Sequence, residues 1–280
     1  IERHAREHGG ALRAADLAAY RPEWVEPIAK HHAGHTLHEI PPNGQGIAAL
    51  IALGILSNFD LKGLKADSTE AQHLQVEAMK LAFADVYRYV AEPASMEVTA
   101  AQLLDDRYLA SRAKLIDMTR AQDFGAGNPV KGGTIYLTAA DANGMMVSFI
   151  QSNYMGFGSG VVVPGYGVSL QNRGHGFSLR AASPNVVAPG KRPFHTIIPA
   201  FLTRDGAPQM GFGIMGGHMQ PQAHVQTLVR MLDHRQHPQA ACDAPRWRVH
   251  DGLERNVERH MPRPTLEALR PRGHPTGGPD

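Results

Sequence analysis

The spacing of hydrophobic residues changes near residue 134 of this 280-residue chain, and this change constrains the fold more than any other feature. Between residues 74 and 90, apolar side chains recur with the period of an amphipathic helix. After residue 134, short β-branched and aromatic runs are separated by turns such as Asn143-Gly144, a strong hairpin signal. Helices followed by antiparallel hairpins predict an α+β protein in which helices cover the sheets.

Capping and turn residues divide the two parts into individual elements. Asp67 and Glu70 form a capping box at the start of a long helix, and Glu92-Pro93 ends it. Residues 1–130 are expected to be mostly helical, and the polar, Gly-rich segment 119–133 is expected to be an exposed linker open to cleavage. The expected helices span residues 46–57, 67–92, 103–116 and 221–232, and the expected strands span residues 134–138, 145–149, 159–163, 168–171, 198–203 and 209–213.

The composition argues against several classes of protein. With 42% hydrophobic residues the chain can bury a substantial core. The net charge is +2 and no basic arm is present, so nucleic acid is not an expected partner. The longest apolar run, residues 47–56, is too short to span a bilayer. The single cysteine, Cys242, excludes an internal disulfide framework but assigns no compartment, so cytoplasmic and periplasmic locations both stay open.

The dipeptide Gly133-Thr134 joins the linker to the first expected strand and is the first candidate for chemistry. A threonine hydroxyl is a weak nucleophile unless a base stands beside it. If the peptide bond before Thr134 breaks, the freed α-amine, with a pKa of about 7.7–8.0, can act as that base near neutral pH. Taken alone, however, the dipeptide favours an ordinary β-branched residue at the start of a strand.

Two glycines and an arginine are further candidates, each with a structural alternative. Gly216-Gly217 follows a strand and precedes the helix at Pro221, so its N–H groups suit an oxyanion hole, and a tight strand-to-helix turn is an equal alternative. Arg173 has the donors to bind a carboxylate, although a surface arginine is the commoner case. Residues 156–160 lack the ending of a phosphate loop and are expected to form a glycine-rich loop near the site.

Histidine and cysteine provide weaker signals. His31, His32, His35 and His38 have a spacing compatible with metal binding, but no cysteine joins them and no fixed motif matches. A polar, partly exposed segment is therefore expected there. Cys242 has no histidine at an informative spacing and is expected to be small buried filler. No metal site is predicted.

The order of the motifs resembles that of the γ-glutamyltranspeptidase family, and the resemblance covers nearly the whole chain. The matching motifs are Gly133-Thr134, residues 141–144, 156–160, 170–172 and 190–193, Pro199, Gly216-Gly217 and residues 243–246. The family implies an N-terminal-nucleophile (Ntn) hydrolase fold, an αββα sandwich of two antiparallel sheets between helical layers. It implies a proenzyme that cuts itself into two subunits of one domain. Residues 1–133 would end the large subunit, whose N-terminal part is expected to be missing here, and residues 134–280 would form a truncated small subunit.

The same resemblance implies roles for individual residues. Cleavage after Gly133 would make Thr134 the N-terminal nucleophile, and Ser152 stands where the family places a neighbouring hydroxyl. Gly216 and Gly217 fall on the oxyanion-hole glycines. The substrate would be a small-molecule amide, and water or an amine acceptor would resolve an acyl-threonine ester. The resemblance implies no cofactor and no metal.

The substrate-binding positions depart from the typical transpeptidase. Where the family holds the substrate α-amine with a Glu and an Asp, this chain has Arg173 and Gly176. Tyr154 replaces an Asn, and the pair His195-Thr196 replaces two serines. Such a pocket should repel an ammonium and prefer an anionic or neutral acyl group. Residues 152–160, 171–175 and 192–199 resemble most the acylase-like and oxamate-amidohydrolase-like branch of the family. The expected substrate-binding residues are Tyr154, Asn172, Arg173, His195 and Thr196.

Three functions remain open from the sequence. The leading hypothesis is a self-processing amidohydrolase or acyltransferase with a threonine nucleophile. One alternative is a true γ-glutamyltransferase, or glutathione hydrolase. The other is an inactive homologue or a truncated, non-catalytic fragment.

Overall fold

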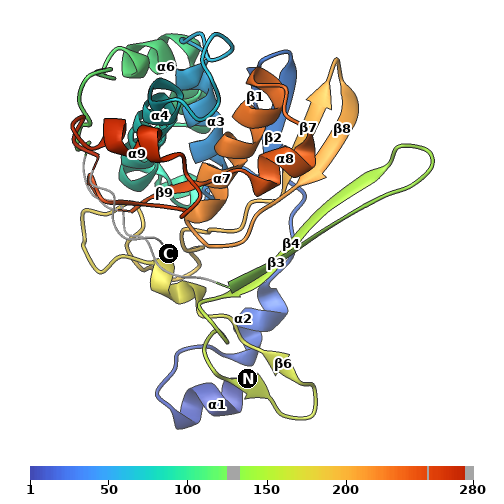
Figure 1. Ribbon diagram of the computed structural model, residues 1–280. Coiled ribbons are helices and arrows are strands. Elements are labelled where there is room, and N and C mark those ends of the chain that lie inside the picture. Colours follow the sequence, from blue (N-terminus) through green and yellow to red (C-terminus); the bar gives the residue numbers. More distant parts are fainter. Residues whose placement is uncertain (125–132, 251, 275–280) are drawn as a thin grey trace.

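The computed structural model describes residues 1–124, 133–250 and 252–274, where helices and antiparallel strands alternate (Figure 1). The helices are α1 (Glu2–Glu7), α2 (Ala14–Ala19), α3 (Gly46–Leu56), α4 (Thr69–Tyr89), α5 (Ala100–Leu103), α6 (Asp106–Ala113), α7 (Met219–Leu228), α8 (Pro238–Asp243) and α9 (Arg263–Leu269), with short turns η1 (Pro93–Ser95), η2 (Arg173–Gly176) and η3 (Val229–Asp233). The strands are β1 (Ile28–His32), β2 (His35–Glu39), β3 (Gly133–Ala140), β4 (Met146–Tyr154), β5 (Val162–Val163), β6 (Val168–Ser169), β7 (Ala200–Arg204), β8 (Ala207–Phe212), β9 (Trp247–Val249) and β10 (Arg255–Val257). None of the described helices is both long and apolar enough to cross a bilayer.

The largest sheet has four antiparallel strands in the order β1-β2-β7-β8, so it combines strands from both sides of residue 134. Its register pairs Leu37 of β2 with Leu202 of β7, and both side chains are buried. Phe212 of β8 contacts His224 of α7, with ring centroids 4.8 Å apart. Because side chains alternate along a strand, these residues define the face that packs on helices. The two parts that the sequence separates therefore share one sheet and one core.

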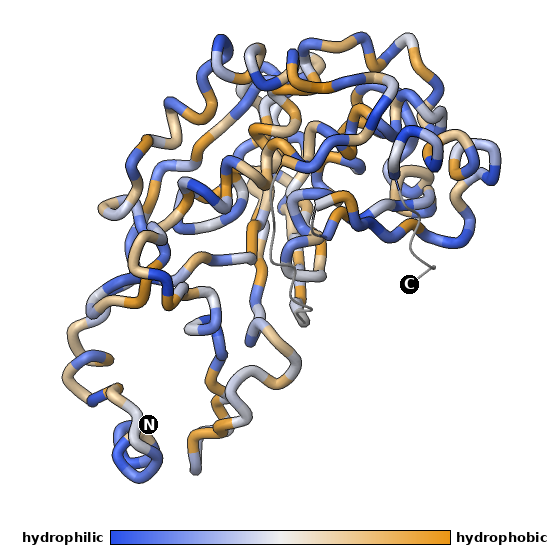
Figure 2. Tube along the Cα trace, turned by 90° about the vertical axis from the view of Figure 1, so that its left-hand side faces the viewer, coloured by the Kyte–Doolittle hydropathy of each residue, from blue (hydrophilic) through white to orange (hydrophobic). Residues whose placement is uncertain are grey.

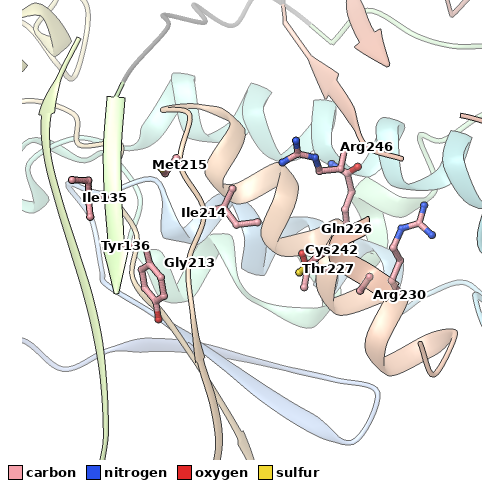
Figure 3. A pocket seen from close by; sticks show the side chains of 11 residues that line it. Ile135, Tyr136, Gly213, Ile214, Met215, Gln226, Thr227, Arg230, Cys242 and Arg246 are labelled. Carbon is pink, nitrogen blue, oxygen red and sulfur yellow. The ribbon is translucent and has the colours of Figure 1, made fainter. Parts of the chain in front are cut away.

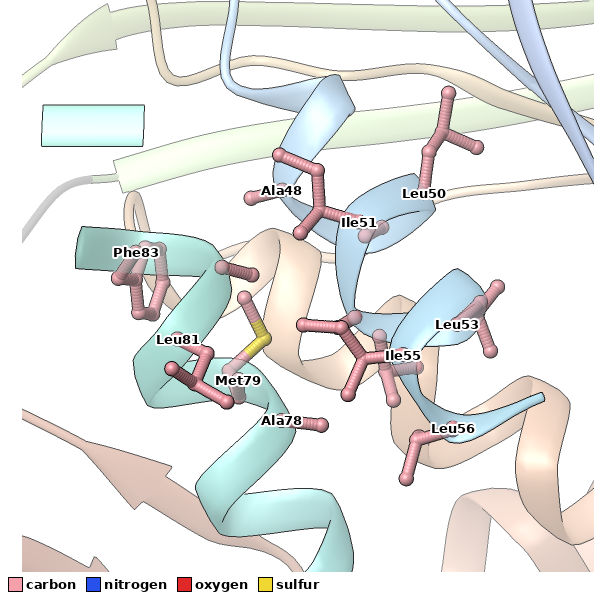
Figure 4. Packing of buried hydrophobic residues seen from close by; sticks show 14 of the residues in the cluster. Ala48, Leu50, Ile51, Leu53, Ile55, Leu56, Ala78, Met79, Leu81 and Phe83 are labelled. Carbon is pink, nitrogen blue, oxygen red and sulfur yellow. The ribbon is translucent and has the colours of Figure 1, made fainter. Parts of the chain in front are cut away.

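Helices α3, α4 and α7 form the layer on this face. Every residue of α3 is buried, because the helix lies between the sheet and α4 and is apolar on all sides. Figure 4 shows Ile51 and Ile55 of α3 directed toward Met79 of α4. Fully burying one such side chain contributes roughly 1.5–3 kcal/mol, so this contact is a main source of the stability of the fold.

Strands β3 and β4 form a long hairpin that stacks on the opposite face of β8. Gly211 and Gly213 allow this close approach, since a Cβ at Gly213 would lie 2.3 Å from the Tyr136 ring. The Ser148 hydroxyl of β4 also donates to the Ala200 carbonyl of β7 over 2.9 Å. Two antiparallel sheets are thus stacked with helices on one side, which agrees with the predicted α+β sandwich.

The other face of the hairpin is apolar and exposed. Ile135 keeps 71% of its surface exposed and Phe149 keeps 48%, and Leu137 and Val147 lie on the same face. The fourth layer of an αββα sandwich would cover this face, which is open in the described part of the chain. Helix α1 does not contribute to the core either: it buries none of its residues, and Figure 2 shows it as a hydrophilic segment at the N-terminal end.

The prediction that residues 1–130 are mostly helical is wrong for one segment. β1 and β2 form an antiparallel hairpin whose turn contains Ala33 and Gly34 at positive φ. The strands were not predicted because the histidines of this segment obscure the alternation of apolar and polar residues that is typical of a strand. His32 is in fact buried and pairs with Asp233, with 2.8 Å between Nε2 and Oδ2.

Several element boundaries also differ from the predicted ones. Ser68, and not Asp67, caps α4 by accepting from the Ala71 N–H over 3.2 Å. Asp67 instead pairs with Arg230 of η3, a contact that no local pattern predicts. The expected helix 103–116 is shorter: α5 ends at Leu103, and α6 begins at Asp106 because the Asp105 side chain caps it. The expected helix at Pro221 begins two residues earlier, with α7.

Of the predicted linker 119–133, residues 125–132 lie outside the described part. The helix 46–57 and the hairpin around Asn143-Gly144 are confirmed.

Candidate active site

Thr134 lies in β3 opposite a β-bulge of β4. The register of the hairpin shifts between Gly133 and Ile135, so two residues of β4, Ser152 and Asn153, oppose Thr134. Thr134 is only 8% exposed. The bulge therefore brings the Ser152 position beside Thr134, as the sequence prediction of a neighbouring hydroxyl requires.

Hydrogen bonds around Asn172 and Tyr154 fix the end of β4. The Tyr154 N–H donates to Ser152 Oγ over 2.8 Å, and Tyr154 adopts a φ of 78°, which is uncommon for a residue other than glycine. The Met155 N–H donates to Asn172 Oδ1 over 3.1 Å, and the Asn172 N–H donates to the Asn153 carbonyl over 3.2 Å. Two of the predicted substrate-binding residues thus hold the strand that carries Ser152.

Arg173 is a buried cation at this site, with 5% of its surface exposed. Its guanidinium donates to Thr196 Oγ1 over 3.0 Å and to the Ser152 carbonyl over 3.5 Å, and it lies 5.3 Å from the centre of the Tyr154 ring. Within the described ranges, no carboxylate is close enough to form an ion pair with it. Burial lowers the pKa of Arg173 to about 10, so the group remains protonated at neutral pH.

His195 and Thr196 lie on the other side of this guanidinium. Thr196 is buried, and the backbone at His195 is held by its N–H, which donates to the Asn43 carbonyl over 3.0 Å. Burial, and then the charge of Arg173, lower the pKa of His195 to about 4. The imidazole is therefore neutral near pH 7, and of the two groups predicted to repel an ammonium only Arg173 carries a charge.

Gly216 and Gly217 form the turn that leads into α7. Their φ angles are 115° and 61°, in the region that glycine adopts without strain. The carbonyls of the two glycines accept hydrogen bonds from the N–H groups of Met219 and Gln220, over 3.1 Å each. In the described part of the chain, neither glycine N–H donates to a backbone carbonyl. These amides at the start of a helix are therefore suited to stabilising a developing oxyanion.

The glycine turn and the start of β3 lie at the same cavity. The cavity has a volume of about 520 Å³ and is lined by Ile135 and Met215, the neighbours of Thr134 and Gly216 (Figure 3). Cys242 also lines it and is exposed, so the prediction of a buried filler residue is wrong. In the sequence Cys242 follows Ala240 and Ala241, and burial there depends on how α8 packs.

Gln45 belongs to the site but was not predicted. It is fully buried at the start of α3, and its side-chain amide donates to the Thr196 carbonyl over 2.6 Å and to the Gly217 carbonyl over 2.8 Å. It connects the Arg173 pocket with the glycine turn. Residues 41–46 read Pro-Pro-Asn-Gly-Gln-Gly, a composition typical of a turn before a helix, but nothing in it indicates where the side chain of Gln45 points.

The comparisons with known proteins agree with this arrangement. The family model described as gamma-glutamyltranspeptidase matches residues 1–279. The chain belongs to the gamma-glutamyltranspeptidase family. Its stacked antiparallel sheets and helices are those of an Ntn hydrolase, as the sequence predicted.

Several relatives of this chain are proenzymes. The "glutathione hydrolase-like YwrD proenzyme" of Bacillus subtilis is 36% identical over 98% of this chain and 53% of its own length. The "oxamate amidohydrolase proenzyme" of Klebsiella pneumoniae is 37% identical over 85% of this chain and 45% of its own. The crystal structure of cephalosporin acylase from Bacillus halodurans matches with a TM-score of 0.93 and 50% identity, over 99% of this chain and 50% of that one. The chain thus spans about half the length of the relatives it matches, and the predicted likeness to the acylase and oxamate-amidohydrolase branch is confirmed.

The backbone around Gly176 leaves no room for a side chain. A Cβ at Gly176 would lie 2.7 Å from the Phe194 carbonyl oxygen. An aspartate at this position would require the backbone to move.

One group of described side chains has the types and spacing of metal ligands, namely His73, Glu77 and His274. His73 Nε2 donates to the Asp117 carbonyl, and 2.6 Å separate His73 Nδ1 from His274 Nε2. The Lys80 ammonium lies 2.5 Å from Glu77 Oε1 and takes the place that a metal cation would need on that carboxylate. We interpret the group as a buried polar network. The four histidines of residues 31–38 form no such group within the described ranges.

His218, directly after the glycine turn, is expected to make the stability of the fold pH-dependent. The side chain is buried beside Tyr87, whose hydroxyl lies 3.0 Å from Nδ1, and burial lowers the pKa of His218 to about 4. Between about pH 6.5 and 4 the unfolded chain binds a proton here that the folded chain does not, so stability falls as the pH falls through this window. Urea unfolding of His218→Gln should show a slope of unfolding free energy against pH about 1.4 kcal/mol per pH unit smaller than that of the wild type. The exposed His260→Gln is the matched control, and an unchanged slope for His218→Gln would contradict the assignment.

Proposed function

We propose that the protein to which this chain belongs is a self-processing amidohydrolase with Thr134 as its N-terminal nucleophile. Cleavage of the bond between Gly133 and Thr134 would divide a precursor into a large subunit ending at residue 133 and a small subunit beginning at residue 134. Both subunits remain one domain, since the central sheet takes β1 and β2 from the first and β7 and β8 from the second.

The reaction follows from the groups around Thr134. The freed α-amine removes the proton from Thr134 Oγ as the oxygen attacks the amide carbon of the substrate. The N–H groups of Gly216 and Gly217 stabilise the negative oxygen that develops. The amine then passes the proton to the leaving nitrogen, and an acyl-threonine ester remains. Water, or an amine acceptor, attacks this ester and restores Thr134.

The observation that carries the choice of substrate is the buried Arg173, which has no carboxylate partner among the described residues. An isolated buried charge is costly, and an anionic ligand would relieve that cost. The neutral His195 adds no second charge, and Gly176 offers no acid for an ammonium. We therefore infer an acyl group that carries a carboxylate or is neutral, and that lacks the α-amine of a γ-glutamyl group.

One relative supports a second candidate function. The Bacillus subtilis protein that is 36% identical is named a glutathione hydrolase-like proenzyme, which favours a γ-glutamyl substrate. In that case an acid to hold the substrate ammonium would have to come from outside the described residues near Arg173.

A substrate panel on the full-length, processed protein distinguishes the two candidates. The panel contains matched γ-glutamyl, glutaryl and oxamate-like amides, each with and without an acceptor dipeptide. We expect kcat/KM for the glutaryl or the oxamate-like amide, which carry a carboxylate but no α-amine, to exceed that for the γ-glutamyl amide at least about tenfold, since one unfavourable charge contact costs several kcal/mol. A preference for the γ-glutamyl amide would support the second candidate instead.

A further inference from the structure

The side-chain amide of Gln45 connects two parts of the site that lie far apart in the sequence. Gln45 Nε2 donates to the carbonyl of Thr196, 151 residues away, and to the carbonyl of Gly217, 172 residues away. Its backbone N–H donates to the His195 carbonyl over 3.0 Å. All three contacts reach across the bond between Gly133 and Thr134, from the large-subunit part to the small-subunit part.

The orientation of this amide follows from its partners. Both neighbours of Nε2 are carbonyl oxygens, which only accept hydrogen bonds, so the NH₂ end must face them. The side chain is fully buried, and both bonds are short. Two hydrogen bonds from one rigid, planar group fix the distance between the two carbonyls that accept them.

Those two carbonyls belong to residues with different tasks. Thr196 accepts a hydrogen bond from Arg173 and so belongs to the acyl-binding pocket. Gly217 supplies one N–H of the oxyanion turn, and its carbonyl caps the first turn of α7 through Gln220. We propose that Gln45 is a positioning residue. It holds the glycine turn of Gly216 and Gly217, whose N–H groups would stabilise the oxyanion, at a fixed distance from the acyl-binding pocket around Arg173 and Thr196. This inference rests on the proposed amidohydrolase function.

Replacing Gln45 by leucine should act mainly on catalysis. The substitution keeps a similar volume but removes the Nε2 donor from two buried carbonyls. The Gly217 carbonyl then keeps its bond from the Gln220 N–H, and the Thr196 carbonyl loses its side-chain donor. The Gly217 N–H then loses its fixed direction, while the Thr134 nucleophile is untouched. We expect kcat to fall by about 10²-fold, the scale of losing one oxyanion-hole donor, with a smaller change in KM.

A second variant gives a signature that a purely structural role would not produce. In Gln45→Glu the ionised carboxylate faces two carbonyl oxygens and donates nothing, whereas the protonated acid donates one hydrogen bond. The ratio of its rate to that of the wild type should therefore rise as the pH falls. The corresponding ratio for Gln45→Leu should stay constant with pH.

Gln75→Leu is the matched control. Gln75 is also buried, and its Nε2 donates to a backbone carbonyl, that of Ala71 within α4, away from the glycine turn. We expect both Gln75→Leu and Gln45→Leu to lower the melting temperature, with the loss of kcat confined to Gln45→Leu.

The outcomes are separable when full-length, processed proteins are compared on one amide. If Gln45→Leu keeps kcat within about threefold of the wild type, or if Gln75→Leu loses as much as Gln45→Leu, the positioning role is wrong. If the wild type itself cleaves no amide of the panel, the proposed function fails. The extent of self-cleavage of each precursor, measured by mass spectrometry, then still reports whether Gln45 and Gln75 differ in their effect on the Thr134 site.

Discussion

Replacing Thr134 by alanine in the full-length precursor is expected to abolish both self-cleavage and amidase activity. Alanine has no oxygen to attack either the bond before residue 134 or a substrate amide, and loss of a nucleophile costs on the order of 10⁴-fold or more in rate. Mass spectrometry should find only the intact precursor, where the wild type gives a small chain beginning at Thr134. Thr134→Ser keeps a hydroxyl and should still be cleaved.

The matched control for this prediction is Thr138→Ala. Thr138 lies on the same strand, and its hydroxyl donates to the Val147 carbonyl over 2.8 Å, away from the bulge at Ser152. This variant should be processed and active. A Thr134→Ala protein that still cleaves itself and still hydrolyses amides would remove Thr134 from the mechanism.

Replacing Arg173 by methionine is expected to reduce kcat/KM for amides with a carboxylate-bearing acyl group by at least about 30-fold. Truncating one partner of a buried charge pair costs about 2–5 kcal/mol, and 2 kcal/mol corresponds to this factor. A neutral amide of the same size should lose much less, because it makes no ion pair with the guanidinium. The measurement is kcat/KM for both amides with the processed variant.

Arg173 also touches Thr196 and the Ser152 carbonyl, so a purely structural role must be tested in the same experiment. If its role were only structural, Arg173→Met would impair the anionic and the neutral amide equally. Arg192→Met, which removes a half-exposed arginine paired with Glu92, is the control for the loss of one positive charge. It should leave the ratio of the two kcat/KM values unchanged.

Local patterns in the sequence predicted the elements whose residues are close together along the chain. Asn143-Gly144 predicted the β3–β4 hairpin, since such a turn suits only a few backbone conformations. The continuous apolar run at 47–56 predicted α3, and the order of short motifs predicted the family. The segment of β1 and β2 was missed because its strands are short and rich in histidine. Their burial comes from contacts with partners such as Asp233, about 200 residues away.

The residues of the candidate site also differ in whether local sequence patterns could predict them. Thr134, the residues around it in the motifs, and the exchange of an acid for Arg173 could be identified from the sequence alone, because each is a choice of residue at one position. Only the tertiary structure decided that Arg173 is buried with no acid beside it in the described ranges, that His195 is neutral, and that Gln45 joins Thr196 to Gly217. Charge state and hydrogen-bond partners depend on which surfaces the fold brings together, and those surfaces come from segments up to 172 residues apart.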